Sequence, residues 1–524
     1  MRNITVLDST LRDGAQGEGM SFSLQDKLNL VQILDDFGIE YIEAGTPGSN
    51  PKDLEFFKKV RSLALKQAKL CAFGATRHKE TSVAKDEGIA ALLAAKTPAI
   101  SLVGKTSRMQ AEKILGVTQR ENERMIADSV RYLKRHGKEI LFDAEHFYDG
   151  YLADPEYALA MLSVAADAGA DILVLCDTNG GRTPTEILKI TRSVCKAFPK
   201  RKIGVHAHND SGCAVANSML AVEAGALHVQ GTFCGFGERC GNADLSVILP
   251  NLLLKKQCVS NVRHLERLCE VASCVAEIAN VSIPGDKPYV GRSAFAHKGG
   301  MHTDGMLKLK GSFEHVSPEL VGNHRRYLMS EVSGRAAFVE KARRFVPSLT
   351  KDSPEAKHLV EKLKEMEYHG YQFEAADASF EMMVLRELGL LKRHFDLVQY
   401  KTIGEYPAPD GQEQASAMIE VKVGERTEIS AAIGDGPVHA LDLALRRALT
   451  VFYPSLKKVH LIDYKVRVLD SESATAAKVR VLIDSTDGSR TWTTVGVSTD
   501  IIEASWLALA DSIEYQLKQE PELK

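Results

Sequence analysis

The first half of the chain alternates short apolar runs with longer segments whose apolar residues recur at helical spacing. Each short run, rich in Ile, Val and Leu, predicts a β-strand, and each longer segment predicts an amphipathic helix. Eight such strands are predicted, at Ile4–Ser9, Ile39–Ala44, Leu70–Gly74, Ala99–Val103, Glu139–Asp143, Asp171–Cys176, Lys202–Ala207 and His228–Thr232. Eight strand–helix units within roughly the first 255 residues are typical of a (β/α)8 TIM barrel, and a doubly wound open sheet is the alternative.

Polar and charged residues gather where these predicted strands end. In a closed barrel the carboxyl ends of all eight strands meet at one mouth. Solvation alone does not explain why such groups recur at one end of nearly every strand. The pattern therefore favours the TIM barrel over the open sheet and predicts a functional site at its mouth, among Arg12, Asp13, Glu43, Arg77, Lys105, Glu145, Asp177, Thr178, His206, His208, Glu238, Arg239 and Asn242.

Two histidines separated by one residue, His206 and His208, lie at the end of the seventh predicted strand. Side chains alternate between the two faces of a strand, so both imidazoles point the same way and can bind one ion. The alternative is that the rings only pack or bind water. Asp13 follows the first strand, which can meet the seventh around a closed mouth. One carboxylate and two imidazoles predict a site for magnesium, manganese or zinc, with positions left open for substrate.

Three further residues are candidates for the chemistry. Arg12 is either a structural partner of Asp13 or a fixed cation that stabilises negative charge on a carbonyl oxygen. Glu145 and His302 are candidate proton-transfer groups. Their spacing along the chain does not show whether they lie within hydrogen-bond reach of a substrate. His302 follows the barrel segment, so it must reach back to a barrel mouth, either its own or that of a partner in a dimer.

Composition narrows the class of protein. With 524 residues, 44% of them hydrophobic and 26% charged, the chain is expected to form two or three globular domains. Its formal net charge of -3 shows no global bias towards nucleic acid or anionic membranes and leaves local charged patches open. The start of the chain lacks an apolar leader, and no uncharged run is long enough to span a membrane, so we expect a cytoplasmic protein. Its nine cysteines are expected to be reduced thiols.

The second half of the chain has a different pattern. Irregular helical segments extend to about residue 400, where a turn-rich stretch at Gly404–Gly411 suggests a boundary. The remaining residues alternate strands and helices, and Val497–Leu509 imperfectly repeats Ile433–Leu445. The alternative is two unrelated strand–turn–helix units. We predict a barrel at 1–275, a mostly helical linker region at 276–400 that contributes to the active site, and an α+β domain at 401–524.

Five ordered motifs resemble those of the isopropylmalate, homocitrate and citramalate synthase family. They are Asp8-Ser9-Thr10-Leu11-Arg12-Asp13-Gly14, Glu43-Ala44-Gly45, His206-Ala207-His208-Asn209-Asp210, Gly237-Glu238-Arg239-Cys240-Gly241-Asn242-Ala243 and His297-Lys298-Gly299-Gly300-Met301-His302. Within the family, three further segments are most similar to the citramalate-forming branch, namely Gln16-Gly17-Glu18-Gly19, Ala144-Glu145-His146-Phe147 and the stretch from Asp463 to Asp470.

This resemblance implies a Claisen-type condensation of acetyl-CoA with a 2-keto acid, followed by hydrolysis of the thioester. Pyruvate is the acceptor expected for this branch, with the larger keto acids of isopropylmalate or homocitrate synthases as alternatives. The family's roles would fall on residues of this chain as follows: metal binding on Asp13, His206, His208 and Asn242; stabilisation of the alkoxide on Arg12; substrate binding on Arg12, Glu43 and Thr178; and proton removal on Glu145 and His302. Relatives commonly have Tyr where this chain has Phe313, so any role of that hydroxyl is in doubt.

The resemblance also implies that the repeat-bearing domain is allosteric. An end-product amino acid, expected to be isoleucine, would bind near the interface of two such domains in a homodimer, with the turn at Gly434, Asp435 and Gly436 as a candidate contact. Two other classes remain as alternatives. A metal-dependent acyl-CoA lyase or aldolase would not need the repeat, and a non-catalytic amino-acid sensor would not need the intact set of Arg12, Asp13, His206 and His208.

Overall fold

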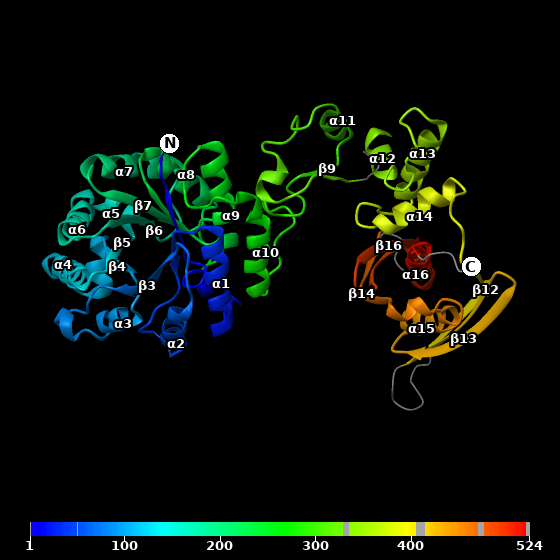
Figure 1. The fold of residues 1–524 in the computed structure, drawn as a ribbon, viewed down its shortest axis with the longest axis horizontal. Helices are drawn as coiled ribbons and strands as arrows, with labels where there is room; N and C mark the ends of the chain where they lie inside the picture. Colours follow the sequence, from blue (N-terminus) through cyan, green and yellow to red (C-terminus); the bar gives the residue numbers. More distant parts are fainter. Residues whose placement is uncertain (1, 50, 329–334, 405–413, 470–475, 520–524) are drawn as a thin grey trace. The chain divides into compact units, whose positions relative to one another are not determined.

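The computed structural model describes residues 2–49, 51–328, 335–404, 414–469 and 476–519. The chain divides into two compact units, one formed by Met1–Phe295 with Glu314–Arg325 and the other by Ala296–Phe313 with Arg326–Lys524 (Figure 1). The chain therefore leaves the first unit after Phe295 and returns to it for twelve residues, Glu314–Arg325. Most of the predicted turn-rich stretch, residues 405–411, lies outside the described residues.

A closed barrel of eight parallel strands forms the core of the first unit, and this confirms the predicted TIM barrel over the open sheet. The strands follow one another in chain order, and β1 closes the circle by pairing with β8, with Thr5 opposite His228 and Asp8 opposite Gly231. The strands are β1 (Thr5–Asp8), β2 (Tyr41–Glu43), β3 (Lys69–Ala75), β4 (Ala99–Lys105), β5 (Glu139–Glu145), β6 (Ile172–Asp177), β7 (Lys202–Ala207) and β8 (His228–Gly231).

Helices surround the barrel strands in the manner expected from the alternating pattern (Figure 1). The first of them begins where Ser23 and Asp26 cap each other's backbone amides, and it ends at Gly38, whose φ of 105° suits glycine. The helices of this unit are α1 (Leu24–Phe37), α2 (Pro51–Lys59), α3 (Glu87–Ala95), α4 (Gln119–Arg135), α5 (Phe147–Ala153), α6 (Pro155–Ala168), α7 (Pro184–Ala197), α8 (Ala214–Ala224), α9 (Leu245–Pro250) and α10 (Leu268–Ile278).

Two apolar layers hold the barrel together. One layer fills the space between the strands and the surrounding helices, and includes residues such as Val6, Ile42 and Ile100. Residues that alternate with these along the strands form a separate cluster inside the barrel: Leu7, Tyr41, Cys71, Ala99, Leu141, Ile172, Val174 and Cys176. Because apolar groups fill the barrel interior, the polar side chains at the carboxyl ends of the strands are confined to the mouth.

The second unit contains two copies of a three-stranded antiparallel sheet followed by a helix, which extends the predicted strand–helix repeat. The first copy comprises β11 (Asp396–Gly404), β12 (Ala415–Val423), β13 (Arg426–Gly434) and α15 (Pro437–Thr450), and the second comprises β14 (His460–Val468), β15 (Val479–Thr486), β16 (Thr491–Ser498) and α16 (Ile501–Lys518). Each helix covers one face of its sheet, and the apolar residues of both copies form one cluster. The break predicted at residue 400 falls within β11.

The region before the repeat is mostly helical, as the pattern predicts. It holds α11 (Gly300–Lys308), α12 (Arg335–Ala342), α13 (Pro354–Tyr368) and α14 (Asp377–Glu387), together with a two-stranded sheet of β9 (Ala296–His297) and β10 (Arg326–Tyr327). Helices α12 to α14 share an apolar cluster with Val495 on β16, and α14 packs against β16 on the outer face of the second sheet. Among the described residues, no helix combines the length and hydropathy needed to cross a membrane.

Candidate active site

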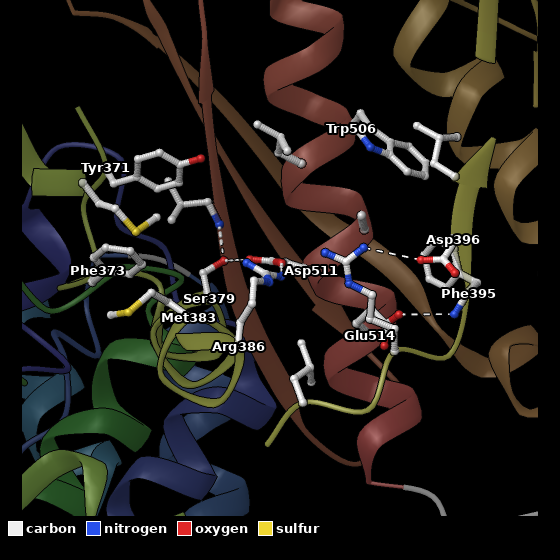
Figure 2. Close-up of a pocket in the computed structure, with 17 residues that line it drawn as sticks. Tyr371, Phe373, Ser379, Met383, Arg386, Phe395, Asp396, Trp506, Asp511 and Glu514 are labelled. Atoms are coloured by element: carbon white, nitrogen blue, oxygen red, sulfur yellow. Dashed lines mark hydrogen bonds and ion pairs between the residues drawn. The ribbon is translucent and has the colours of Figure 1, made fainter. Parts of the chain in front are cut away.

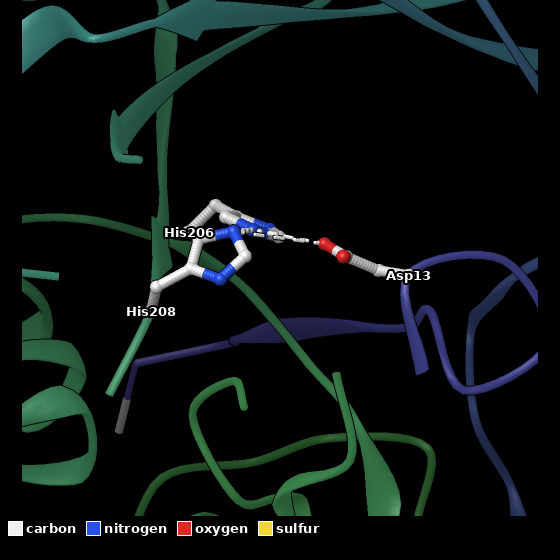
Figure 3. Close-up of side chains that lie close together, drawn as sticks. All are labelled: Asp13, His206 and His208. Carbon is white, nitrogen blue, oxygen red and sulfur yellow. Dashed lines mark hydrogen bonds and ion pairs between the residues drawn. The ribbon is translucent and has the colours of Figure 1, made fainter. Parts of the chain in front are cut away.

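The barrel mouth brings together Asp13, His206 and His208, and their side chains point towards one another (Figure 3). One ligand atom from each lies within 4.8 Å of the other two. The Nε2 atom of His206 is 3.3 Å from Asp13 Oδ2 and 3.4 Å from His208 Nε2. All three residues are buried, with exposed fractions of 2% to 7%. His206 near the end of β7 and His208 just after that strand therefore direct both imidazoles to the same place, as the sequence predicts.

This donor set fits a divalent cation. Two imidazole nitrogens and a carboxylate leave room for substrate and water oxygens around one ion. Asn242 adds a fourth candidate ligand, because its backbone pairs with that of His208 and its Oδ1 atom is buried without a hydrogen-bond partner among the described residues. Its Nδ2 atom donates to the carbonyl oxygen of Phe236, which fixes the amide group. A buried acceptor without a donor is costly unless a bound ion or ligand satisfies it.

The electrostatics of the three residues suit a bound cation. Burial raises the pKa of Asp13, but the Arg12 charge and the hydrogen bond with His206 outweigh it, so the pKa lies well below its usual range. Burial and the neighbouring His206 lower the pKa of His208 to about 4. Burial also lowers the pKa of His206, but Asp13 more than compensates and raises it. An ionised carboxylate and at least one neutral imidazole are the forms that bind metal.

Arg12 lies beside the metal-site carboxylate and is held on several sides. Its Nε atom donates to Glu43 Oε2 at 2.6 Å, and its Nη1 atom lies 3.4 Å from Asp13 Oδ2. The guanidinium carbon is 3.9 Å from the centroid of the Phe73 ring. Burial lowers the pKa of Arg12, but the charges of Asp13 and Glu43 raise it above its usual value. The guanidinium is therefore a cation held in a fixed position beside Asp13. Its role in stabilising charge on a carbonyl oxygen stays a prediction.

Glu43 lies behind Arg12 and is fully buried. Its Oε2 atom accepts hydrogen bonds from Ser9 and Arg12, and its Oε1 atom has no partner among the described residues. It does not line the cavity at the mouth. The geometry therefore supports a role for Glu43 in holding Arg12, and its contact with substrate, which the resemblance implies, stays a prediction.

Glu145 and Thr178 line the cavity from neighbouring strands of the barrel. Glu145 forms an ion pair with Lys105, the residue opposite it on β4. Thr178 Oγ1 accepts a hydrogen bond of 2.8 Å from the backbone amide of His146, so its own hydroxyl hydrogen is left to donate to a ligand. The cavity encloses about 230 Å³, and its wall adds the less polar side chains Phe73, Val103 and Cys176.

His302 belongs to the second compact unit, on α11, so its predicted role at a barrel mouth stays a prediction. Its ring stacks on that of Phe313, with centroids 4.3 Å apart and an angle of 19° between the planes. Phe313, which stands where relatives commonly have Tyr, thus directly contacts His302, a predicted catalytic residue. A Phe ring keeps this stacking and contributes no hydroxyl.

Two buried polar residues beside the site were not predicted as site residues. Asp143 lies two residues before Glu145 on β5, and Gln230 lies on β8. Burial, and to a lesser degree Glu43, raise the pKa of Asp143 to about 7. The alternation of side chains along β5 places Asp143 on the same face as Glu145, a signal that was available in the sequence. Gln230 carried no such signal, because its hydrogen bond with Asp143 joins β8 to β5, which lies far from it in the chain.

A second cavity, of about 310 Å³, lies in the second unit between α14 and α16 (Figure 2). Its charged side chains already pair with one another or with neighbours. Asp511 accepts from Arg386 and Ser379, and Glu514 accepts from the ring and backbone of His394. Because these pairs satisfy the charges, this cavity offers no arrangement comparable to that at the barrel mouth.

The predicted effector turn joins β13 to α15 in the second unit. Gly436 is the residue before the first turn of α15, and Pro437 begins the helix. The Asp435 carboxylate is exposed and lies 3.1 Å from His439 Nδ1. A Cβ atom on Gly434 would lie 2.6 Å from the backbone nitrogen of Ala440, so this glycine is needed where the strand meets the helix.

Comparison with known proteins covers nearly the whole chain. An HMGL-like model matches residues 3–275, a homocitrate synthase post-HMGL domain-like model matches residues 289–370, and a LeuA allosteric (dimerisation) domain model matches residues 374–517. The chain is 49% identical to an (R)-citramalate synthase of Aquifex aeolicus, over 99% of this chain and 98% of that protein.

Two further relatives show the breadth of the family. The chain is 46% identical to an (R)-citramalate synthase of Geobacter sulfurreducens, over 100% of this chain and 99% of that protein. It is 31% identical to a 2-isopropylmalate synthase of Methanocaldococcus jannaschii, over 97% and 94% of the two chains. The chain belongs to the citramalate synthase branch of the isopropylmalate, homocitrate and citramalate synthase family.

Proposed function

We propose that this protein condenses acetyl-CoA with pyruvate and hydrolyses the resulting thioester to give (R)-citramalate and CoA, as a step in isoleucine biosynthesis. The full-length similarity to (R)-citramalate synthases at 43% to 49% identity carries the proposal. The small cavity and the three clustered metal-binding candidates support the proposal. A 2-keto acid bound to a metal needs ligands that hold the ion and a cavity that holds the acid.

Asp13, His206 and His208, with Asn242, would hold the divalent metal, most suitably Mg²⁺ or Mn²⁺. When bound, such an ion polarises a keto group and binds a carboxylate oxygen. Arg12 would stabilise the negative charge that develops on the keto oxygen, and Glu43 would keep its guanidinium in place. The hydroxyl of Thr178 would donate to the substrate carboxylate. Glu145, with His302, would remove a proton from the acetyl methyl group.

The proposed acceptor is tested by measuring free thiol release from acetyl-CoA with single 2-keto acids. The highest kcat/KM is expected with pyruvate, then lower values for 2-ketoisovalerate and 2-ketoglutarate. A mismatch of one methylene in an apolar pocket changes binding by about 1–3 kcal/mol, and both larger acids exceed pyruvate by two carbon atoms, so the preference should be at least roughly 10-fold. A higher kcat/KM with either larger acid would instead make the protein an isopropylmalate or homocitrate synthase.

We further propose feedback inhibition by isoleucine at the C-terminal domain, near the turn at Asp435. The LeuA allosteric domain match supports this, and so does the position of the turn at the start of a helix, where backbone amides favour a carboxylate. The substitution Asp435→Ala should raise the isoleucine concentration for half-inhibition and leave uninhibited kcat unchanged. Unchanged inhibition would remove this turn from the effector site.

We also propose a homodimer that forms through the first sheet of the repeat. Ile429 and Ile433 on β13 are 60% and 63% exposed, and Ile403 on β11 is 57% exposed. Ile403 and Ile433 both lie opposite Ser416 on β12, so they share the sheet face that faces away from α15. In the second copy α14 covers the corresponding face, where Val495 is buried.

A further inference from the structure

Behind His206, a chain of buried hydrogen bonds links three strands of the barrel. Gln230 on β8 joins His206 on β7 to Asp143 on β5. The Nδ1 atom of His206 is 3.0 Å from Gln230 Oε1, and Gln230 Nε2 donates to Asp143 Oδ1 at 3.0 Å. The three residues are only 1% to 6% exposed. A glutamine buried this deeply is costly unless both ends of its amide are paired, and here both are.

The chain of bonds has a direction. A primary amide has one donating end and one accepting end. Gln230 Nε2 donates to Asp143 Oδ1, so the amide nitrogen faces Asp143 and the carbonyl oxygen faces His206. The ring can then pair with that oxygen only if Nδ1 carries the hydrogen. In this tautomer the lone pair of His206 is on Nε2, the atom that faces Asp13 and His208.

From this geometry we propose that Gln230 is a positioning residue that fixes the tautomer of His206 for metal binding, with Asp143 holding the glutamine in its orientation. The proposal rests on the metal role proposed above for His206. Metal-binding histidines commonly donate their second nitrogen to an acceptor, and loss of that acceptor typically lowers metal affinity by about 10- to 100-fold. Here an amide oxygen serves as the acceptor, and a carboxylate on another strand sets its orientation.

His208 provides a contrast within the same site. Its Nδ1 atom is buried and has no hydrogen-bond partner among the described residues. Among the residues that the structure describes, no comparable chain of hydrogen bonds sets the tautomer of that ring. Within this part of the chain the two histidines therefore differ, and His206 is the one held by residues from strands β5 and β8.

The test measures Mn²⁺ binding by the full-length, metal-free protein, using the free Mn²⁺ signal in electron paramagnetic resonance. Gln230→Met keeps the length of the side chain and removes both hydrogen bonds, so we expect Mn²⁺ affinity to fall about 10- to 100-fold. The double variant Asp143→Asn with Gln230→Glu exchanges the amide and the carboxylate. In this variant the carboxylate at position 230 accepts from His206 Nδ1, and the amide at position 143 donates to that carboxylate. We expect its Mn²⁺ affinity to return to within about threefold of the unmodified chain.

Each outcome separates this inference from the proposed function. Unchanged Mn²⁺ affinity in Gln230→Met would overturn the positioning role, while the metal site would stand if His208→Ala still lost binding. A double variant that binds as weakly as Gln230→Met would also overturn it, since packing alone would then explain the loss. If Gln230→Met does not fold, as judged by circular dichroism, the Mn²⁺ affinity of the double variant decides whether the positioning role stands. Failure of the unmodified chain to bind Mn²⁺ would overturn both the inference and the proposed metal site.

Discussion

The fixed position of Arg12 predicts that its shape matters as much as its charge. Glu43 and Asp13 contact different parts of the guanidinium, and Phe73 lies against its flat face. The ammonium of a lysine cannot reproduce this planar fork of donors. In Arg12→Lys we expect kcat for thiol release to fall by about 10²- to 10³-fold, the usual effect of losing one donor to a developing oxyanion.

The control for this prediction is Arg108→Lys, a partly exposed arginine that pairs with Asp154 outside the cavity. It should keep normal kcat. Mn²⁺ affinity of Arg12→Lys should stay within a few-fold of the unmodified chain, because Arg12 is not a ligand. A kcat within threefold of normal would mean that Arg12 only partners the neighbouring carboxylates.

The second prediction at this scale concerns a direct metal ligand. His208→Ala removes one imidazole from the cluster, so we expect Mn²⁺ affinity to fall by more than about 100-fold, beyond the loss for an orienting partner. Far-ultraviolet circular dichroism should be unchanged because the barrel core is built from other residues. The exposed His264 gives a matched control in His264→Ala. Near-normal turnover of His208→Ala in chelator-treated buffer would show that the site is elsewhere.

At the scale of residues, the sequence predicts short-range geometry well and long-range pairing poorly. The spacing of His206 and His208 is enough to place both rings on one side of a strand, and the structure brings Asp13 to them. In contrast, the partnership of Gln230 with Asp143 joins residues 87 positions apart. Such a pair depends on the closure of the barrel, and a single sequence carries no sign of it.

At the scale of elements, the junction of β1 and β8 predicts how the barrel responds to acid. His228 on β8 is fully buried, its Nδ1 atom is 2.9 Å from the Thr5 hydroxyl, and its ring packs edge-on against Tyr41. Burial, with a smaller effect of Lys202, lowers the pKa of His228 to about 3. Between pH 6.5 and 3 the unfolded chain therefore binds a proton that the folded chain does not. The contribution of neutral His228 to the free energy of unfolding is therefore fully present above pH 6.5. Between pH 6.5 and 3 it falls by about 1.4 kcal/mol for each pH unit.

The substitution His228→Gln keeps an acceptor for Thr5 and cannot bind this proton. We expect its unfolding midpoint in urea, followed by circular dichroism, to fall less between pH 7 and pH 5 than that of the unmodified chain. His264→Gln, at an exposed position, should follow the unmodified chain. Parallel pH dependence in all three proteins would show that His228 does not contribute to acid sensitivity.

The elements themselves were predicted closely. All eight predicted barrel strands are present, as their short and regularly spaced apolar runs indicate. The repeat was recognised only where a strand joins a helix, at β13–α15 and β16–α16. The other strands of the repeat, such as β14, alternate apolar and polar residues at an exposed edge, so their pairing could not be inferred from Tyr464 or Val466 alone.

At the scale of the whole molecule, the uncovered sheet face predicts the oligomeric state. The full chain should be a dimer at micromolar concentration by light scattering after gel filtration. The double substitution Ile429→Lys with Ile433→Lys places two charges on this face and should shift the protein towards the monomer. The control is Leu390→Lys, because Leu390 is also exposed, at 59%, but lies outside the sheets. An unchanged mass in the double variant would place the dimer interface elsewhere.

Isoleucine inhibition predicts that pyruvate binding at the barrel mouth and isoleucine binding in the C-terminal domain weaken each other. If the effector binds in the C-terminal domain, it can act only through different affinities for two arrangements of the protein. Isoleucine should then raise the Kd for pyruvate by a limited factor, typically about 5- to 150-fold, and pyruvate should raise the Kd for isoleucine by the same factor. Calorimetric titration of each ligand at fixed concentrations of the other measures the two Kd values, with leucine and valine as controls. A Kd for pyruvate that reaches a plateau at high isoleucine supports a separate site, whereas a rise without limit means that isoleucine competes at the barrel mouth and that the C-terminal domain lacks the proposed role.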